Sequence, residues 1–161
     1  MNNKAESGKF IVFTIAEYFL ALPIFSVLKV VNYPLQGNDN LRAAGLVQIG
    51  QHTLVLLDLH QKLATSYAPP LTRNSPFLVV TQVVQGELCA IPVDEPPNLV
   101  ELPKDTIQTL PKSYHQNGLL DLVSHVAVFS HEEETFTIFL LDMNRVLSAT
   151  TNSSTPRLIA G

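Results

Sequence analysis

Serine, histidine, cysteine and carboxylate side chains are the groups in this sequence that could catalyse a reaction. Nucleophilic catalysis requires a Ser or Cys beside a His that a carboxylate orients. These residue types are present, but no Gly-x-Ser-x-Gly sequence places a serine on a nucleophile turn. The single cysteine, Cys89, lies inside an apolar run and is interpreted as a structural thiol. The sequence therefore predicts no catalytic residue.

Two groups combine histidine with carboxylates, the side chains that bind metals or exchange protons. His131–Glu134 (HEEE) is expected at a hairpin tip, where a solvated charged turn is favoured over a metal site. Asp58 and His60 are interpreted as a helix cap and a surface histidine. A small-molecule or hydrolytic site using His52, His60 and Asp58 remains an alternative. We predict no metal and no cofactor.

Composition excludes several other classes of function. The 161 residues are 46% apolar and 15% charged, with a net charge of −4. Residues 1–73 carry six Lys/Arg and four Asp/Glu, whereas residues 74–161 carry four and ten. This balance provides no cationic surface for nucleic-acid phosphates. One cysteine cannot form an intramolecular disulfide, which is typical of a reducing compartment.

Phe10–Val31 is apolar enough to suggest a membrane span. However, Glu17, Pro23 and Lys29 interrupt it, and a charge at the centre of a bilayer costs about 2.5 kcal/mol or more. The start of the chain does not have the order of charged and apolar regions of a signal peptide. We therefore predict a cytoplasmic protein without membrane insertion.

The chain repeats itself. LLDLHQKL at Leu56–Leu63 returns as LLDMNRVL at Leu140–Leu147, with the aspartates 84 residues apart (142 − 58). ALPI at Ala21–Ile24 returns as AIPV at Ala90–Val93, with the prolines 69 residues apart (92 − 23). Self-similarity of this kind predicts two copies of one small structural unit. The difference between the two spacings is attributed to an insertion at Leu102–Gly118.

Each copy reads as five strands followed by a short helix. β-Branched and aromatic runs between turn residues predict the strands. In the first copy they are Phe10–Ile15, Tyr18–Leu22, Val27–Val31, Ala44–Ile49 and Thr53–Leu57. In the second they are Phe77–Val84, Glu87–Ile91, Asn98–Glu101, Leu122–Phe129 and Thr135–Leu141. Asp58 and Asp142 are predicted to cap the two helices, the second of which runs to about Ala149.

The predicted fold is all-β with short helices, in two small five-stranded barrels packed side by side. Residues 1–8 are expected to be a loose segment, residues 9–149 the domain, and residues 150–161 a flexible tail. Within the domain, subdomain one covers about 9–67, a linker 64–75, and subdomain two about 76–149.

The order of these pieces resembles the CheW-like domain family, the adaptor module of bacterial chemotaxis-type signalling. The pieces that carry the resemblance are the strand Phe10–Ile15, YFLALPI at Tyr18–Ile24, Val27–Val31, GLVQI with LVLLDL across Gly45–Leu59, AIPV, and FLLDMNRVL at Phe139–Leu147. The resemblance implies two SH3-like barrels, no enzymatic activity, and a scaffold that joins a CheA-type histidine kinase regulatory domain to cytoplasmic chemoreceptor tips. It also implies that exposed barrel ends dock the kinase and that the groove between the barrels holds the receptor.

The chain departs from the family pattern at one hairpin. The family usually reads G-[LV]-I-N-L-R-G, where this chain has Gly45–Gln51 (GLVQIGQ), so Gln48, Gly50 and Gln51 replace Asn, Arg and Gly. Val55 replaces the usual Pro. The candidate partner-binding residues are Gln48, Gly50, Gln51, His52 and Val55. Because Gly lacks the hydrogen bonds and stacking of Arg, the standard receptor contact is not expected to carry over.

Two functions from different classes follow from these observations. The first is a non-catalytic adaptor between the kinase and receptors of a chemotaxis or other motility pathway. The second is a self-associating structural module of the same fold that has lost receptor coupling. The hairpin strands are apolar on both faces, which fits either a covered core strand or a surface kept for a partner.

Overall fold

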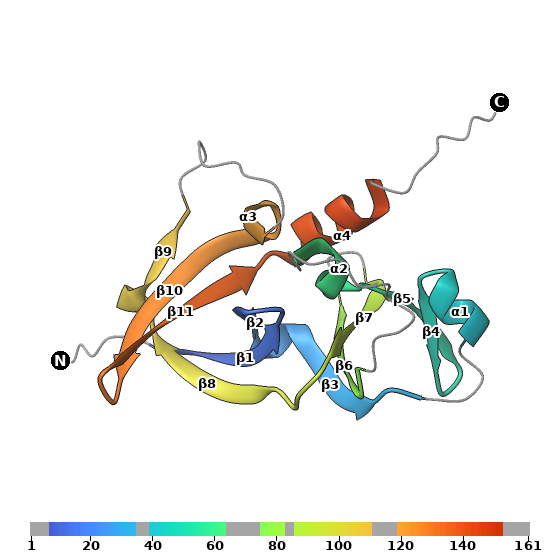
Figure 1. Cartoon of the computed structure of the whole chain (residues 1–161), viewed down its shortest axis with the longest axis horizontal. Coiled ribbons are helices and arrows are strands. Elements are labelled where there is room, and N and C mark those ends of the chain that lie inside the picture. The colour runs from blue at the N-terminus through green and yellow to red at the C-terminus, as the bar shows by residue number, and fades with distance from the viewer. Residues whose placement is uncertain (1–6, 35–38, 64–74, 83–85, 111–118, 153–161) are drawn as a thin grey trace.

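A computed structural model describes residues 7–34, 39–63, 75–82, 86–110 and 119–152 (Figure 1). The described chain forms two sheets. The six-stranded sheet has the order β8 (Asn98–Pro103), β1 (Ser7–Ile15), β2 (Tyr18–Pro23), β11 (Glu134–Leu141), β10 (Val123–His131) and β9 (Ile107–Thr109). The five-stranded sheet has the order β3 (Val27–Asn32), β6 (Phe77–Gln82), β7 (Leu88–Val93), β5 (His52–Leu56) and β4 (Leu46–Ile49).

Short helices connect these strands and cover the space between the sheets. They are α1 (Asp39–Ala43), α2 (Leu59–Leu63), α3 (Leu119–Leu122), α4 (Met143–Asn152) and the 3-10 turns η1 (Ile24–Ser26) and η3 (Lys104–Thr106). In Figure 1, α2 and α4 lie next to each other between the two sheets. The β-rich fold with few short helices confirms the predicted fold class.

Each sequence repeat gives its first hairpin to the sheet of the other repeat. The β1–β2 hairpin joins β8 and β11, and the β6–β7 hairpin joins β3 and β5. Sheet membership therefore does not follow the predicted division into residues 9–67 and 76–149. The hydrophobic pattern identifies a strand and its buried faces, but it does not identify the strand beside which it pairs.

The two hairpin exchanges are related by the spacings of the sequence repeat. β5 runs parallel to β7 with Val55 opposite Cys89, and β11 runs parallel to β2 with Phe139 opposite Leu20. Adding 84 to the β5 position (55 to 139) and subtracting 69 from the β7 position (89 to 20) turns the first pair into the second. Both sheets are therefore built from equivalent strands, which confirms the duplication and the two spacings read from the sequence.

The additional strand of the larger sheet comes from the predicted insertion. η3 and β9 lie within Leu102–Gly118, and β9 pairs with β10 at the edge of the sheet. The prediction of a polar segment without strands was therefore wrong for this part. The helix α1 also begins inside an expected loop, and α4 continues past Ala149 to Asn152. The predicted N-terminal segment, linker and tail lie mostly outside the described residues.

Three apolar clusters fill the molecule because the strands are buried on both faces. Leu20 and Leu22 of β2 face a central cluster, to which both sheets and the helices α2 and α4 contribute. Ala21, between them, faces a second cluster inside the six-stranded sheet. A third cluster, which includes Leu54 and Leu56, lies inside the five-stranded sheet. This alternation follows from the two-residue period of a strand, and it makes the exchanged hairpins part of every core.

The exchange predicts that neither half of the chain folds alone. We expect fragments 1–70 and 71–161 to be unfolded separately, since Leu20 in one and Cys89 in the other lose their parallel partners. Mixed in equal amounts they should form one folded complex, measured by the dispersion of amide NMR signals. A Leu20→Asp fragment should fail to complement, whereas Leu28→Asp, at a half-exposed site, should succeed. A folded first fragment on its own would contradict the exchange.

Candidate partner-binding surfaces

The predicted partner-binding residues lie on the β4–β5 hairpin, at the free edge of the five-stranded sheet. Gln48, Gly50, Gln51 and His52 are all exposed at or next to its turn. The Gln48 side-chain amide donates a hydrogen bond of 3.4 Å to the Gly50 carbonyl. The structure thus brings these four residues together on one accessible tip.

Gly50 has the left-handed backbone that its turn requires, with φ of 61°. A Cβ atom placed there would meet no atom within 4 Å, so the restriction is conformational and not one of space. A non-glycine residue pays on the order of 1 kcal/mol or more in this region. The loss of the Arg that the sequence comparison assigned to this position is therefore accompanied by a turn that favours Gly.

Val55 differs from the other four candidates because it is half-buried. It lies opposite Leu46 in β4 and Cys89 in β7, and it packs against the central apolar cluster. Its main contribution is therefore to the core, in agreement with the interpretation of a covered strand.

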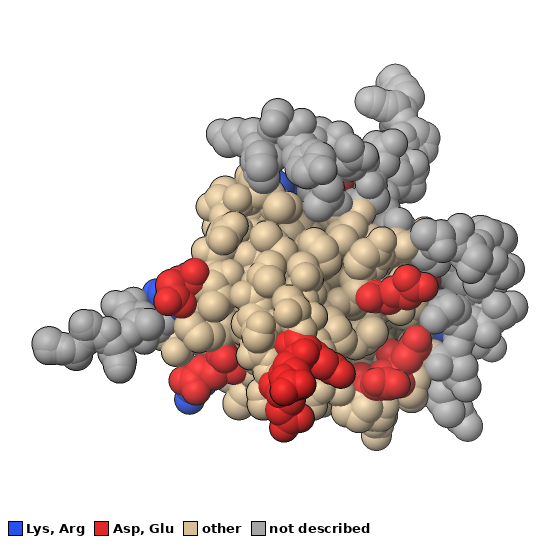
Figure 2. All heavy atoms as spheres, turned by 60° about the vertical axis from the view of Figure 1, so that its left-hand side comes forward, with Lys and Arg blue, Asp and Glu red and all other residues tan. Residues whose placement is uncertain are grey.

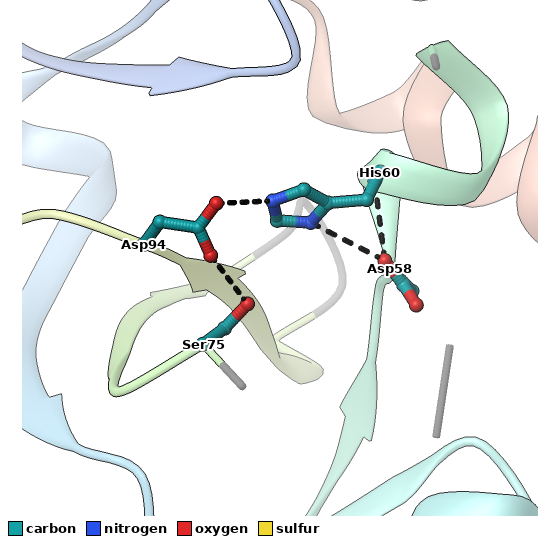
Figure 3. Close-up of polar contacts among 4 residues, drawn as sticks. All are labelled: Asp58, His60, Ser75 and Asp94. Atoms are coloured by element: carbon teal, nitrogen blue, oxygen red, sulfur yellow. Dashed lines mark hydrogen bonds and ion pairs between the residues drawn. The ribbon is translucent and has the colours of Figure 1, made fainter. Parts of the chain in front are cut away.

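Asp58 caps α2 as predicted, since its Oδ1 accepts a hydrogen bond of 3.1 Å from the His60 backbone N–H. The equivalent Asp142 accepts one of 3.0 Å from the Asn144 N–H. His60, however, is not the surface residue that was predicted: only 3% of it is exposed. It lies between two carboxylates, with Nδ1 3.5 Å from Asp58 Oδ1 and Nε2 3.3 Å from Asp94 Oδ2 (Figure 3).

Ser75 completes this polar cluster but does not form a catalytic group with His60. Its hydroxyl donates a hydrogen bond of 2.8 Å to Asp94 Oδ1, so Ser75 and His60 contact the two oxygens of one carboxylate (Figure 3). An activated serine must instead donate its proton to the histidine. His52 is exposed while His60 is buried, so the alternative site of His52, His60 and Asp58 is not assembled into one open pocket.

The cluster joins parts of the chain that are distant in sequence. Asp94 follows β7, which belongs to the exchanged hairpin, whereas Asp58 and His60 follow β5. Sequence reasoning missed Ser75 and Asp94, because a partner 34 residues away leaves no local pattern. The arrangement fastens the exchanged hairpin to the end of β5.

The other candidate groups behave as structural or solvated residues. Burial raises the pKa of the Cys89 thiol to about 11, with a further contribution from the Glu87 carboxylate, so Cys89 is not a reactive thiolate. His131 and Glu132 are exposed at the β10–β11 tip, 3.6 Å apart. Within the described ranges, no three His, Cys, Asp or Glu residues are grouped closely enough to hold a metal ion.

A second accessible surface follows β2 and was not predicted. η1 and β3 expose large apolar side chains at Ile24, Phe25, Leu28 and Val30, with Phe25 85% exposed. β3 is the outer strand of the five-stranded sheet, and Lys29 is its only charged residue. Apolar residues on both faces of this strand were the available sequence signal. A contiguous surface of this kind is typical of a protein interface.

A family model for the CheW-like domain matches residues 9–151. The chain belongs to the CheW-like domain family. Its members are non-catalytic scaffold proteins, and membership supports an adaptor or scaffold role in chemotaxis-type signalling. The match spans both sheets, so the exchanged hairpins lie inside the CheW-like domain.

Among solved structures, the CheW-like fold of this chain is similar to that of the scaffolding protein TtCheW from Thermoanaerobacter tengcongensis. The TM-score is 0.61 at 15% sequence identity, over 85% of this chain and 90% of that one. At this identity the likeness establishes the fold alone. Comparison with curated proteins gives no match. Across the described residues, no helix is sufficiently long and apolar to cross a membrane.

The polar cluster predicts a pH-dependent stability. Burial raises the pKa of the Asp58 carboxyl, but the hydrogen bonds and charge of His60 and the Gln61 N–H outweigh burial and lower the pKa below 3.8. A lowered folded pKa stabilises the protein above the unfolded value, and this contribution is lost as pH falls through the folded pKa. Asp58→Asn, which keeps a good cap, should therefore be less stable than wild type at pH 7, and the gap should close towards pH 3.

Urea denaturation between pH 3 and pH 7 measures this difference. A double-mutant cycle with His60→Ala should give a coupling of about 0.5–3 kcal/mol at pH 7, because the two side chains are in contact. A gap between wild type and Asp58→Asn that is unchanged at pH 3 would show that the carboxylate charge does not contribute.

Proposed function

We propose that this chain is a cytoplasmic adaptor that couples the regulatory domain of a CheA-type histidine kinase to the cytoplasmic tips of chemoreceptors. Membership of the CheW-like family supports the general role. The observation that carries the more specific proposal is the exposed apolar surface on η1 and β3, which a monomer has no structural reason to keep.

The kinase regulatory domain is the partner proposed for the η1–β3 surface. Phe25 projects farthest into solvent, and Leu28 and Val30 follow it at alternate positions of an edge strand. Interfaces depend on a few large apolar anchors surrounded by weaker contacts. Phe25 is therefore expected to be the main anchor.

The receptor contact is assigned to the β4–β5 hairpin, at Gln48, Gly50, Gln51 and His52. These residues offer amide and imidazole groups on an exposed tip, but no cation. Receptor binding through this tip is expected to depend less on salt than it would with an Arg at position 50, because no charge pair forms there. The two partners thus bind separate surfaces and can be tested independently.

Binding of a purified CheA-type regulatory domain, measured by isothermal titration calorimetry, tests the proposal. Phe25→Asp should weaken binding at least tenfold, equivalent to about 1.4 kcal/mol, because it places a charge in an apolar contact. Val128→Asp is the matched control, since Val128 is an exposed apolar residue on β10, outside this surface. Absence of binding by the wild-type chain at high micromolar concentration would contradict the proposal.

A further inference from the structure

A hollow of about 530 Å³ lies on the six-stranded sheet, away from both surfaces described above. β1, β2, β8 and the tip region of the β10–β11 hairpin surround it. Its apolar lining consists mainly of Val12, Phe19, Leu99, Phe129, Phe136 and Ile138. Phe19 is 37% exposed and Leu99 57% exposed, so an incoming side chain would cover apolar surface that now faces solvent.

The aromatic rings in the hollow are held by one another. Phe136 packs edge-on against Phe19, with ring centroids 6.0 Å apart, and stacks on Phe129 at 5.6 Å. Residues from two strands of one hairpin and from β2 thus form one apolar wall. Because these rings already support each other, little ordering would be needed when a partner binds, and this favours affinity.

The rim of the hollow is acidic. Glu95 and Glu101 line it, and no Lys or Arg does. His131 also lines it and leads into the three glutamates of the β10–β11 tip. Lys9 lies opposite Glu101 on β1 and offsets one of these charges. The end of the molecule that faces forward in Figure 2 shows Asp and Glu side chains around a broad uncharged area, with Lys and Arg only at its margin.

We propose that this hollow is a docking site for a protein segment that inserts an apolar or aromatic side chain flanked by Lys or Arg. The apolar wall provides the contact area, and the acidic rim selects the charge of the partner and accelerates its approach. An acidic segment would meet Glu95, Glu101 and Glu132–Glu134 and be repelled. The site is separate from the η1–β3 surface and from the β4–β5 tip, so it does not depend on the kinase or receptor proposals.

Selection from a phage-displayed library of random 12-residue peptides, on the immobilised full-length chain, tests this inference. The enriched peptides should share an apolar or aromatic residue with at least two Lys or Arg. A synthetic copy of the strongest peptide should lose at least tenfold in affinity between 50 mM and 500 mM salt, because exposed charges are screened. A copy with Glu in place of Lys and Arg should not bind.

Two variants locate the binding surface. Leu99→Asp should weaken the peptide at least tenfold, whereas Val128→Asp, an exposed apolar site on β10 that does not line the hollow, should leave its affinity unchanged. Both positions are at the surface, and circular dichroism would establish that both variants fold. Glu95→Lys, which changes only the rim charge, should weaken binding about threefold or more.

Three results would overturn the proposal: no enrichment, enrichment of neutral or acidic peptides, or equal binding by Leu99→Asp. If the chain instead self-associates and Leu99→Asp abolishes this, the occupant is a second copy, and a foreign cationic segment is excluded. None of these readouts measures kinase binding, so failure here leaves the adaptor proposal standing.

Discussion

The parallel pairing of each repeat's first hairpin with the last strand of the other repeat is the contact on which the structure depends. β2 lies along β11 and β7 along β5 in equivalent registers. Each short parallel ladder places hairpin residues into the central cluster and into one sheet interior. A repeat without its partner would leave a hairpin with no sheet and a sheet with no closing hairpin, so the two sheets form a single folding unit.

This constraint also determines what remains accessible. The hairpins and the last strands are buried by the exchange, so exposed apolar side chains occur at the periphery: on η1 and the edge strand β3, and in the hollow of the six-stranded sheet. The His60 cluster fastens the exchanged β6–β7 hairpin to α2 and contributes to rigidity, not to chemistry. A rigid body with several separate exposed surfaces is suited to an adaptor, which must hold partners in fixed positions.

The sequence predicted the strands, the duplication and both helix caps, because each depends on local patterns. Asp58 and Asp142 are preceded by apolar runs and followed by leucines at the same spacing, and both act as caps. The hairpin exchange could not be predicted, since Leu20 and Leu22 are equally suited to any buried strand. The position of His60 was wrong for the same reason: its carboxylate partner Asp94 is close only after the hairpins exchange. The accessible surfaces needed the structure, since the same apolar residues fit a covered strand.

NMR measurement of interstrand backbone NOEs tests the exchange most directly. The structure predicts NOEs between Leu56 and Ala90 and between Leu140 and Ala21, in dilute samples where they must arise within one chain. The Leu57 amide, which donates a hydrogen bond of 2.8 Å to the Ala90 carbonyl, should exchange with solvent only on global unfolding. Absence of both NOEs, with β1–β2 paired instead to β3, β4 or β5, would contradict the account.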